Sequence, residues 1–263
     1  MASKGTALVT GASGGIGADL ARELARSGFD LILVARSEGK LEDLGEELAK
    51  AHGISFHVLT SDLAAPDAAK KLVDELASRK LQVDVLVNNA GYALFGAFTE
   101  TDAVDEAKMI QLNIMALTQL SKLLLPGMVE RKSGRIMNVA STAAFQPGPL
   151  MAVHYATKAY VLSFSEAIAE ELRGSGVSVT ALCPGPTKSG FQARAKMEES
   201  KLVKGKAIMD SATVARAGVE GLLAGKAVVI PGAKNYWLAQ SVRFMPRSVV
   251  VRAVKQAQER EGH

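Results

Sequence analysis

The stretch that decides the fold is TGASGGIG, residues 10–17, which follows the apolar run TALVT at residues 6–10. It places Gly11, Gly15 and Gly17 between a predicted strand and a predicted helix over residues 15–26. Glycine lets the backbone approach a phosphate, and the start of a helix offers free N–H groups and the positive end of its dipole. The spacing is Gly-x3-Gly-x-Gly, and a tight turn without a ligand is the alternative. The strand before and the helix after favour a dinucleotide site.

Outward from this loop, short β-rich runs alternate with longer amphipathic segments. This alternation predicts an α/β fold, with a doubly wound parallel sheet and right-handed crossovers. Apolar runs without strict alternation indicate strands buried on both faces. We find neither a linker nor a repeat, so residues 1–263 are predicted to form one domain with helices on both faces of about seven strands. The strands are expected at 6–10, 30–36, 54–63, 83–91, 134–141, 177–185 and 226–232, and the later helices at 40–53, 67–79, 102–130, 152–173 and 211–225.

The composition argues against several classes of function. The net charge of +4 is too small and too scattered to indicate nucleic-acid binding. One cysteine, Cys183, excludes an intramolecular disulfide and fits a reducing compartment. No room for a signal peptide precedes the first strand, and no apolar run approaches the roughly 20 residues that span a bilayer. We therefore expect a cytoplasmic protein, and no metal site, because the histidines lack zinc-ligand spacing. These are His52, His57, His154 and His263.

The end of the second predicted strand indicates which dinucleotide is bound. An acidic residue there would hold the ribose hydroxyls and repel a 2′-phosphate. Here the strand ends in Ala35, Arg36 and Ser37, and Arg36 can pair with a 2′-phosphate while Ser37 donates a hydrogen bond. We assign Glu38 to the first turn of the next helix, where an acid suits the dipole. A solvated charge is the alternative for Arg36, but the local chemistry favours NADP(H) over NAD(H).

Several motifs, in order along nearly the whole chain, together resemble the short-chain dehydrogenase/reductase family. They are TGASGGIG, SDL at 61–63, NNAG at 88–91, QLNIM at 111–115, NVAS at 138–141 and PGPT at 184–187. The resemblance implies a Rossmann-like fold, a small-molecule carbonyl or alcohol substrate, NADP(H), and a homodimer or homotetramer. It implies that the cofactor-binding residues are Gly11, Ser13, Gly15, Ile16, Gly17, Arg36, Ser37, Asp62, Leu63, Asn89, Ala90, Gly91, Lys158, Pro184, Gly185 and Thr187.

The resemblance also implies individual roles. Asp62 would contact the adenine, Asn113 would belong to a proton relay, Ser141 would orient the substrate, and Thr187 would touch the nicotinamide carboxamide. Each has a structural alternative: Asn88 and Asn89 as turn formers, Ser141 as a helix cap, Asn113 as a buried polar group. All of them fall at the carboxyl ends of predicted strands or on adjoining helices, which is the edge where open α/β sheets bind ligands.

The chain departs from the family at the signature Tyr-x-x-x-Lys. Lys158 matches the lysine that the resemblance assigns to the nicotinamide ribose, but the residue four positions earlier is His154, and the tyrosine is Tyr155. Counting from Ser141 also gives position 154 for the proton donor. Because Tyr155 is rotated by about 100° around the helix axis from His154, we expect it to be structural. The predicted catalytic residues are therefore Asn113, Ser141, His154 and Lys158.

His154 changes the expected chemistry. A neutral imidazole can donate a hydrogen bond to a carbonyl, but full proton transfer requires the imidazolium ion. Its pKa starts at about 6.5 and a neighbouring lysine cation lowers it. We therefore expect slow carbonyl reduction, best at mildly acidic pH, because a lost general acid costs about 10²–10⁴-fold in rate. The alternative is that His154 is a polar helix residue without a role.

The remaining segments bear on the substrate. Residues 187–210 are predicted to form a lid. The tail, residues 235–263, is basic and apolar and could pack on the core, join an oligomer or touch an anionic membrane. Because Pro246 breaks any long amphipathic helix, we expect packing or oligomer contact.

The side chains expected to border the substrate pocket indicate an apolar ketone or aldehyde. The alternative is that they are core residues. These are Phe95, Phe145, Leu150, Met151, Phe191 and Met197.

Three functions are compatible with these observations. The first is an NADP(H)-dependent carbonyl reductase or alcohol dehydrogenase whose activity is reduced or altered by His154. The second is a catalytically silent NADPH-binding sensor or scaffold. The third, a lyase or dehalogenase on the same fold, is disfavoured because the glycine-rich loop, Arg36 and Lys158 serve a dinucleotide.

Overall fold

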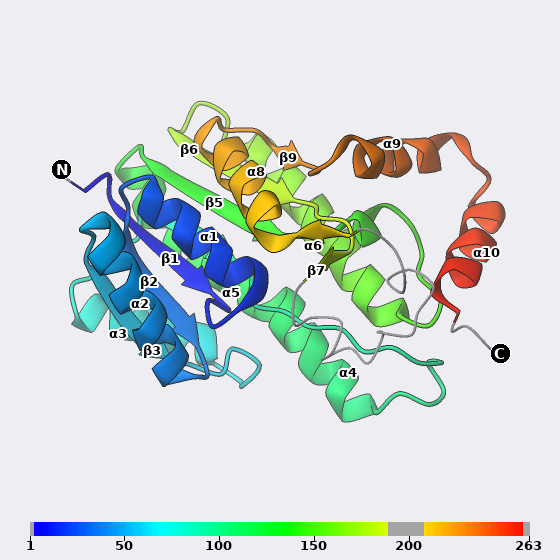
Figure 1. Cartoon of the computed structure of the whole chain (residues 1–263), viewed down its shortest axis with the longest axis horizontal. Helices are drawn as coiled ribbons and strands as arrows, with labels where there is room; N and C mark the ends of the chain where they lie inside the picture. Colours follow the sequence, from blue (N-terminus) through cyan, green and yellow to red (C-terminus); the bar gives the residue numbers. More distant parts are fainter. Residues whose placement is uncertain (1–2, 189–207, 260–263) are drawn as a thin grey trace.

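The computed structural model describes residues 3–188 and 208–259. Its centre is a parallel sheet of seven strands in the order β3-β2-β1-β4-β5-β6-β9 (Figure 1). The prediction of a doubly wound sheet of about seven strands is confirmed. The strands are β1 (Thr6–Thr10), β2 (Asp30–Ala35), β3 (Phe56–Thr60), β4 (Val85–Asn88), β5 (Gly134–Val139), β6 (Val177–Leu182) and β9 (Val228–Val229).

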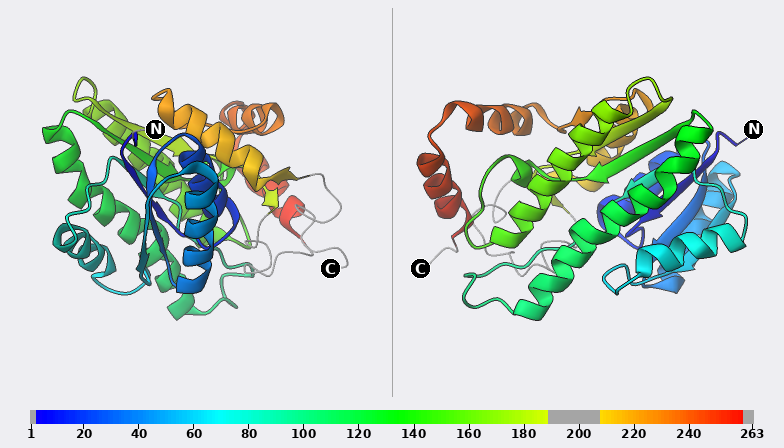
Figure 2. Two further views of the ribbon diagram at one scale, coloured as in Figure 1. Left: turned by 60° about the vertical axis from the view of Figure 1, so that its left-hand side comes forward. Right: turned by 180° about the vertical axis from the view of Figure 1, so that it is seen from behind.

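Helices cover both faces of this sheet because the strands are apolar on both sides. Leu31 and Leu33 of β2 pack in one core cluster, and Ile32 and Val34 pack in the other. One face carries α1 (Gly15–Arg26), α2 (Glu38–His52) and α8 (Ser211–Leu223). The opposite face carries α3 (Ala68–Ser78), α5 (Leu117–Glu130) and α6 (Ala152–Glu171) (Figure 2).

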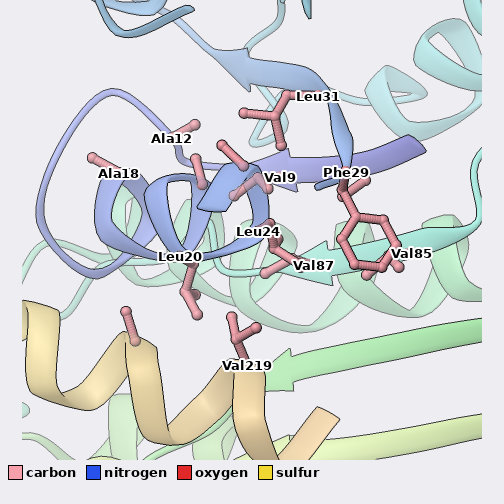
Figure 3. Packing of buried hydrophobic residues seen from close by; sticks show 14 of the residues in the cluster. Val9, Ala12, Ala18, Leu20, Leu24, Phe29, Leu31, Val85, Val87 and Val219 are labelled. Carbon is pink, nitrogen blue, oxygen red and sulfur yellow. The ribbon is translucent and has the colours of Figure 1, made fainter. Parts of the chain in front are cut away.

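The first of these clusters joins helices that are far apart in the sequence. Leu20 of α1 and Val219 of α8 point toward each other, while Leu24 and Val9 fill the space between α1 and the sheet (Figure 3). All four side chains are buried. This packing fixes the start of α1, and with it the glycine-rich loop, against the carboxyl end of β1.

The long helix predicted over residues 102–130 is present and has three segments. It consists of α4 (Ala103–Ile110), the π-helical turn η1 (Gln111–Ala116) and α5. Among the described residues, the stretch Ala103–Glu130 is long and apolar enough to cross a membrane by length and composition. The expectation that no apolar stretch approaches that length was therefore wrong for this helix. Its inner face packs on the sheet through Leu120 and Met128.

The remaining elements lie around the carboxyl edge of the sheet and at one end of the molecule. The short strands β7 (Thr187–Lys188) and β8 (Met209–Asp210) pair in parallel. Two residues each are too few to show a pattern in the sequence. Residues 189–207 of the predicted lid, with Phe191 and Met197, lie outside the described residues. The chain also contains η2 (Thr142–Phe145), α9 (Ala233–Ser241), η3 (Val242–Phe244) and α10 (Arg247–Gln258). Figure 1 shows α9 and α10 at the end far from the N-terminus.

Candidate active site

One cavity of about 970 Å³ contains almost all of the predicted site residues. It lies beyond the carboxyl ends of β1 and β4, which are neighbours in the sheet although β2 and β3 come between them in sequence. This is the topological switch point, where open α/β sheets bind ligands. The predicted residues that line it are Gly11, Ser13, Gly15, Ile16, Gly17, Arg36, Ser37, Asp62, Leu63, Asn89, Ala90, Gly91, Ser141, His154, Lys158, Pro184, Gly185 and Thr187.

The glycine-rich loop has a backbone that side chains would not allow. Gly11 and Gly15 have φ values of 69° and 56°, in the left-handed region. A Cβ on Gly17 would lie 2.2 Å from the carbonyl oxygen of Gly11. The N-cap residue of α1 is Gly14, so no side chain caps the first turn of this helix. The loop therefore leaves a glycine-lined cradle at a helix N-terminus, which suits a diphosphate group.

Thr10 and Asn89 hold this loop against the end of β4. The side-chain amide nitrogen of Asn89 donates to the backbone carbonyl of Thr10 over 2.9 Å. The hydroxyl of Thr10 accepts from the backbone N–H groups of Asn89 and Ala90, both at 3.0 Å. It donates to the carbonyl of Val87 over 3.1 Å. Thr10 was not predicted as a site residue, although it immediately precedes the glycine-rich loop.

The far end of the cavity is exposed and cationic. Arg36 and Ser37 line it, and so does Lys40, which the sequence analysis missed. Neither Arg36 nor Lys40 forms an ion pair with another described residue. Glu38 lies in the first turn of α2, as predicted, and does not line the cavity. A second cation, in the first turn of the helix after Arg36, was the signal available in the sequence.

Asn113 is the one predicted site residue that does not line the cavity. It is buried in the π-helical turn η1, where its amide nitrogen donates to the Tyr92 carbonyl over 3.0 Å and to the Thr157 hydroxyl over 3.1 Å. Its side-chain oxygen accepts from the Tyr92 N–H over 3.2 Å. The Thr157 hydroxyl in turn donates to the His154 carbonyl over 2.7 Å. Asn113 thus connects the β4 loop to α6 directly behind the cavity.

Ser141 connects the end of β5 to the PGPT loop. Its hydroxyl donates to the Pro184 carbonyl over 3.3 Å and accepts from the N–H of Ala143 over 3.1 Å. It therefore caps η2, the structural alternative considered above, and also lines the cavity. The Thr187 hydroxyl donates to the Gly185 carbonyl over 2.9 Å. These bonds hold the serine and the loop in one fixed arrangement.

Lys158 is buried at the inner end of the cavity. Its ammonium group donates to the carbonyl of Val139 over 2.7 Å. Burial lowers the pKa of Lys158 to about 8, and the electrostatic effect of Cys183 opposes this shift. The carbonyl fixes the amine at the end of β5, so that its remaining donors are available to a ligand in the cavity.

His154 lines the same inner end and is also buried. Burial, followed by the positive charge of Lys158, lowers the pKa of His154 to about 3, and a hydrogen bond to the Tyr92 backbone opposes the shift. Because that hydrogen bond raises the pKa, it stabilises the protonated ring, so the ring is its donor. With a pKa near 3 the imidazole stays neutral in mildly acidic solution. This pKa does not favour the expected acidic optimum, because burial outweighs the ordinary basicity of the ring.

Tyr155 also lines the cavity, but its hydroxyl is bonded to the C-terminal helix. Its hydroxyl accepts a hydrogen bond from the side-chain amide of Gln258 on α10. Its ring packs directly on Gly148, where a Cβ would lie 2.3 Å from the ring atoms, and clusters with Val250 and Val254. Burial raises the pKa of Tyr155 to about 12. These contacts agree with the expected structural role, since Tyr155 attaches the C-terminal helix to α6.

The chain matches a known family over most of its length. The profile of the short chain dehydrogenase family matches residues 5–200. This chain is a short-chain dehydrogenase. Membership implies a nicotinamide cofactor and places the protein among oxidoreductases that act on small molecules.

Curated relatives and solved structures support this short-chain dehydrogenase assignment. The human very-long-chain 3-oxoacyl-CoA reductase is 36% identical over 182 residues, covering 68% of this chain and 58% of that protein. The chain therefore matches less than two thirds of that relative's length. A short-chain dehydrogenase from Sphingobium yanoikuyae, solved with NADPH, is 32% identical with a TM-score of 0.82, covering 98% of this chain and 100% of that one. A bulky-bulky ketone specific alcohol dehydrogenase from Comamonas testosteroni is 27% identical with a TM-score of 0.78, covering 100% and 97%.

The substrate side of this short-chain dehydrogenase differs in part from expectation. Met151 lines the cavity, but Phe95, Phe145 and Leu150 do not. Phe95 and Phe145 pack instead against neighbouring apolar clusters, the core alternative considered above. Their aromatic character could not distinguish the two environments. The wall is completed by side chains that the sequence analysis missed, among them Tyr92, Leu94, Ala143, Gln146, Leu238 and Ala239.

Proposed function

We propose that this short-chain dehydrogenase is an NADP(H)-dependent carbonyl reductase or alcohol dehydrogenase whose proton-donor position holds His154. One observation carries the proposal: a single cavity joins the glycine-rich cradle and Arg36 to Ser141, His154 and Lys158. A sensor would need only the first part of that cavity. The second part brings a hydroxyl, an imidazole and an ammonium group to the site of a reacting carbonyl.

The residues present fit NADP(H). The cradle around Gly11 and Gly17 excludes side chains and suits the diphosphate. At the exposed end, the Arg36 guanidinium, the Ser37 hydroxyl and the Lys40 ammonium would hold a 2′-phosphate. Glu38, outside the cavity, does not oppose it. NADPH in the Sphingobium yanoikuyae relative supports the same preference.

The inner end of the cavity supplies orientation without a ready proton. Bound NADPH would supply a hydride. Ser141 would exchange its weak bond to Pro184 for one to the carbonyl oxygen of the substrate, and Lys158 would hold the nicotinamide ribose. His154, with a pKa of about 3, would meet that oxygen as a neutral ring. Since full proton transfer needs the imidazolium ion, carbonyl reduction is slow and is not restored by mild acid.

The cavity wall favours an apolar ketone or aldehyde. Leu94, Ala143, Met151 and Leu238 line its substrate side. The names of two relatives, a reductase of 3-oxoacyl-CoA and an alcohol dehydrogenase for bulky ketones, describe carbonyl compounds with large apolar groups. We extend that class to this chain, together with a cytoplasmic location and a homodimeric or homotetrameric assembly.

The second candidate is a catalytically silent NADPH-binding sensor or scaffold. The observation that favours it is the low pKa of His154, which leaves no protonated imidazole at the proton-donor position. The intact arrangement of Ser141 and Lys158 favours the enzyme, because neither is needed to bind the adenosine half of the cofactor.

Binding and turnover, measured separately, test the proposal. Calorimetric titration of the purified chain should show NADPH bound at least about tenfold more tightly than NADH, as expected for charge-assisted bonds to a phosphate. A panel of ketones with increasing apolar bulk should then give slow NADPH oxidation that depends on the ketone. Tight NADPH binding without turnover on any carbonyl would support the sensor. Equal affinity for NADH would contradict the proposed NADP(H) preference, and no binding of either dinucleotide would contradict both functions.

A further inference from the structure

A basic segment lies near the C-terminus, so the positive charge is less scattered than expected from the net charge alone. Residues 221–258 contain no aspartate or glutamate between Glu220 and Glu259. Because the whole chain carries +4 and this segment carries +6, the remainder carries about −2. The segment is therefore strongly basic and has no acidic residue to offset its cations. Its cations are Lys226, Lys234, Arg243, Arg247, Arg252 and Lys255.

The same region exposes large apolar side chains. We define the C-terminal corner as residues 233–255, comprising α9, η3 and most of α10, which protrude at one end of the molecule (Figures 1 and 2). Trp237 is 69% exposed and Phe244 is 87% exposed, the highest value among the exposed large apolar residues. Aromatic side chains are rarely left so open on a protein that has no partner for them. The exposed apolar residues of the corner are Tyr236, Trp237, Leu238, Phe244, Met245 and Val249.

The corner is anchored on its inner side. Val250, Val254 and Gln258 of α10 are buried, and Gln258 bonds to Tyr155 of the active-site helix. The expected packing on the core is thus present, but it uses only one side of α10. Pro246 does end one helical segment before the next, as expected. The break produces a turned corner that leaves Phe244 and Met245 outward.

We propose that the C-terminal corner docks on the surface of an anionic phospholipid bilayer. Tryptophan and tyrosine favour the boundary between lipid headgroups and acyl chains, because their rings are apolar and their N–H or O–H groups are polar. Lysine and arginine beside them are attracted by anionic headgroups. With no carboxylate in the segment, nothing on it repels that surface.

A second copy of the chain fits the corner less well. A two-fold contact would bring the same surface patch of both chains together. It would therefore place the cations of one corner against the identical cations of the other, without any acidic residue from residues 221–258 to pair with them. An anionic bilayer supplies the missing opposite charge.

Docking would bring the membrane next to the candidate active site. Asn235, Leu238 and Ala239 of α9 line the cavity on one side, while Tyr236 and Trp237 are exposed on the same helix. An apolar carbonyl compound dissolved in the bilayer would then reach the cavity beside the docked helix. This consequence, unlike the docking itself, rests on the proposed function.

The fluorescence of Trp237, the single tryptophan of the chain, tests the proposal without cofactor or turnover. Titration with phosphatidylcholine vesicles that contain phosphatidylglycerol should shift its emission to the blue and make the protein sediment with the vesicles. Vesicles of phosphatidylcholine alone should give a much smaller effect, and high salt should reverse the binding. An absence of shift and of sedimentation would overturn the proposal.

Matched variants separate the corner from the rest of the surface. Phe244→Ser and Arg247→Glu should each weaken vesicle binding by about tenfold or more. Two control variants outside the corner should leave vesicle binding unchanged. They are Phe98→Ser, at a residue that is 69% exposed, and Lys50→Glu on α2. Unchanged thermal midpoints would show that all four variants are folded. Equal losses of vesicle binding in the control variants would contradict membrane docking by the corner. A blue shift without vesicles that grows with protein concentration and accompanies a doubled mass would also contradict it, and would assign the corner to contact with a second copy of the chain.

Discussion

The two ends of the candidate cofactor cavity carry basic groups in opposite environments. Arg36 and Lys40, at one end, are exposed and form no ion pair with described residues. Lys158 and His154, at the other end, are buried, and their pKa values fall to about 8 and about 3. Burial is the largest cause in both cases. Basic side chains thus provide a fixed positive charge at the exposed end, whereas burial weakens their hold on the proton at the other end.

This contrast explains why the position of a residue in a motif does not define its chemistry. A tyrosine at position 154 would be neutral when protonated, so burial would help it keep its proton until the reaction needs it. Histidine is charged when protonated, so the same burial removes the proton. Histidine and tyrosine at this position would therefore differ by more than their pKa values in water, because burial shifts the proton affinity of the two side chains in opposite directions.

The largest expected effect concerns the proton donor at the buried end of the cavity. His154→Tyr should raise the rate of NADPH oxidation with apolar ketones by about 10²–10⁴-fold, because it restores a general acid beside Ser141 and Lys158. Steady-state rates with the ketone panel would measure it. Tyr155→Phe is the matched control, since that hydroxyl bonds to Gln258 and should affect the rate far less. An unchanged rate in His154→Tyr would sink the claim that position 154 limits the reaction.

The next effect concerns stability at low pH. The folded pKa of His154, about 3, lies below the unfolded value of about 6.5, so between these values the unfolded chain binds a proton that the folded chain does not. The His154 contribution is therefore retained above about pH 6.5 and decreases as the pH falls. Between about pH 6.5 and pH 4 the wild type should lose on the order of 3 kcal/mol more than His154→Tyr. Urea unfolding at several pH values measures this difference, and parallel curves for the two proteins would contradict it.

At the exposed end the effect should fall on affinity alone. Arg36→Ala should weaken NADPH binding by about 10–100-fold, because a charge-assisted pair contributes roughly 1.5–3 kcal/mol. Lys40→Ala should have a smaller effect in the same direction, and NADH binding should change little in either variant. Lys50→Ala, on the same helix but outside the cavity, serves as the control. Equal losses of NADPH and NADH affinity would show that these residues do not recognise the 2′-phosphate.

The smallest effect lies where the C-terminal helix meets the buried end. Gln258→Leu should destabilise the fold by about 1 kcal/mol, because it removes the hydrogen bond to the buried hydroxyl of Tyr155. The double variant Tyr155→Phe, Gln258→Leu should recover part of this loss, since neither polar group then stays buried without the other. Thermal or urea unfolding measures both. Strictly additive losses would show that this bond does not couple α10 to α6.

The sequence was sufficient for the sheet and for most of the candidate site. Strands buried on both faces leave near-continuous apolar runs, and the site residues sit in short motifs at their carboxyl ends. Gly11 and Gly17 were recognisable because their role is local: the backbone there leaves no room for a side chain. Lys40 was missed although it lies in the turn after Arg36, because its place in the cavity depends on how α2 leaves the sheet.

What the sequence did not reveal depends on contacts between distant segments. The pKa of His154 is set mainly by burial that packing of the chain produces, so its local pattern could not give the size of the shift. Phe95 and Phe145 could not be separated from pocket residues by type. The bond from Asn113 to Thr157 and the bond from Gln258 to Tyr155 join residues 44 and 103 positions apart.

The measurement that tests the central claim most directly is the titration of the His154 imidazole by nuclear magnetic resonance. The chain has four histidines, so isotope-labelled histidine gives few signals, and His154→Gln identifies the one that matters. The account predicts that this signal shows no protonation between about pH 8 and pH 5, because the pKa lies near 3. A titration midpoint close to the ordinary value of about 6.5 would contradict it, since a ring that protonates there could supply the proton that we infer to be missing.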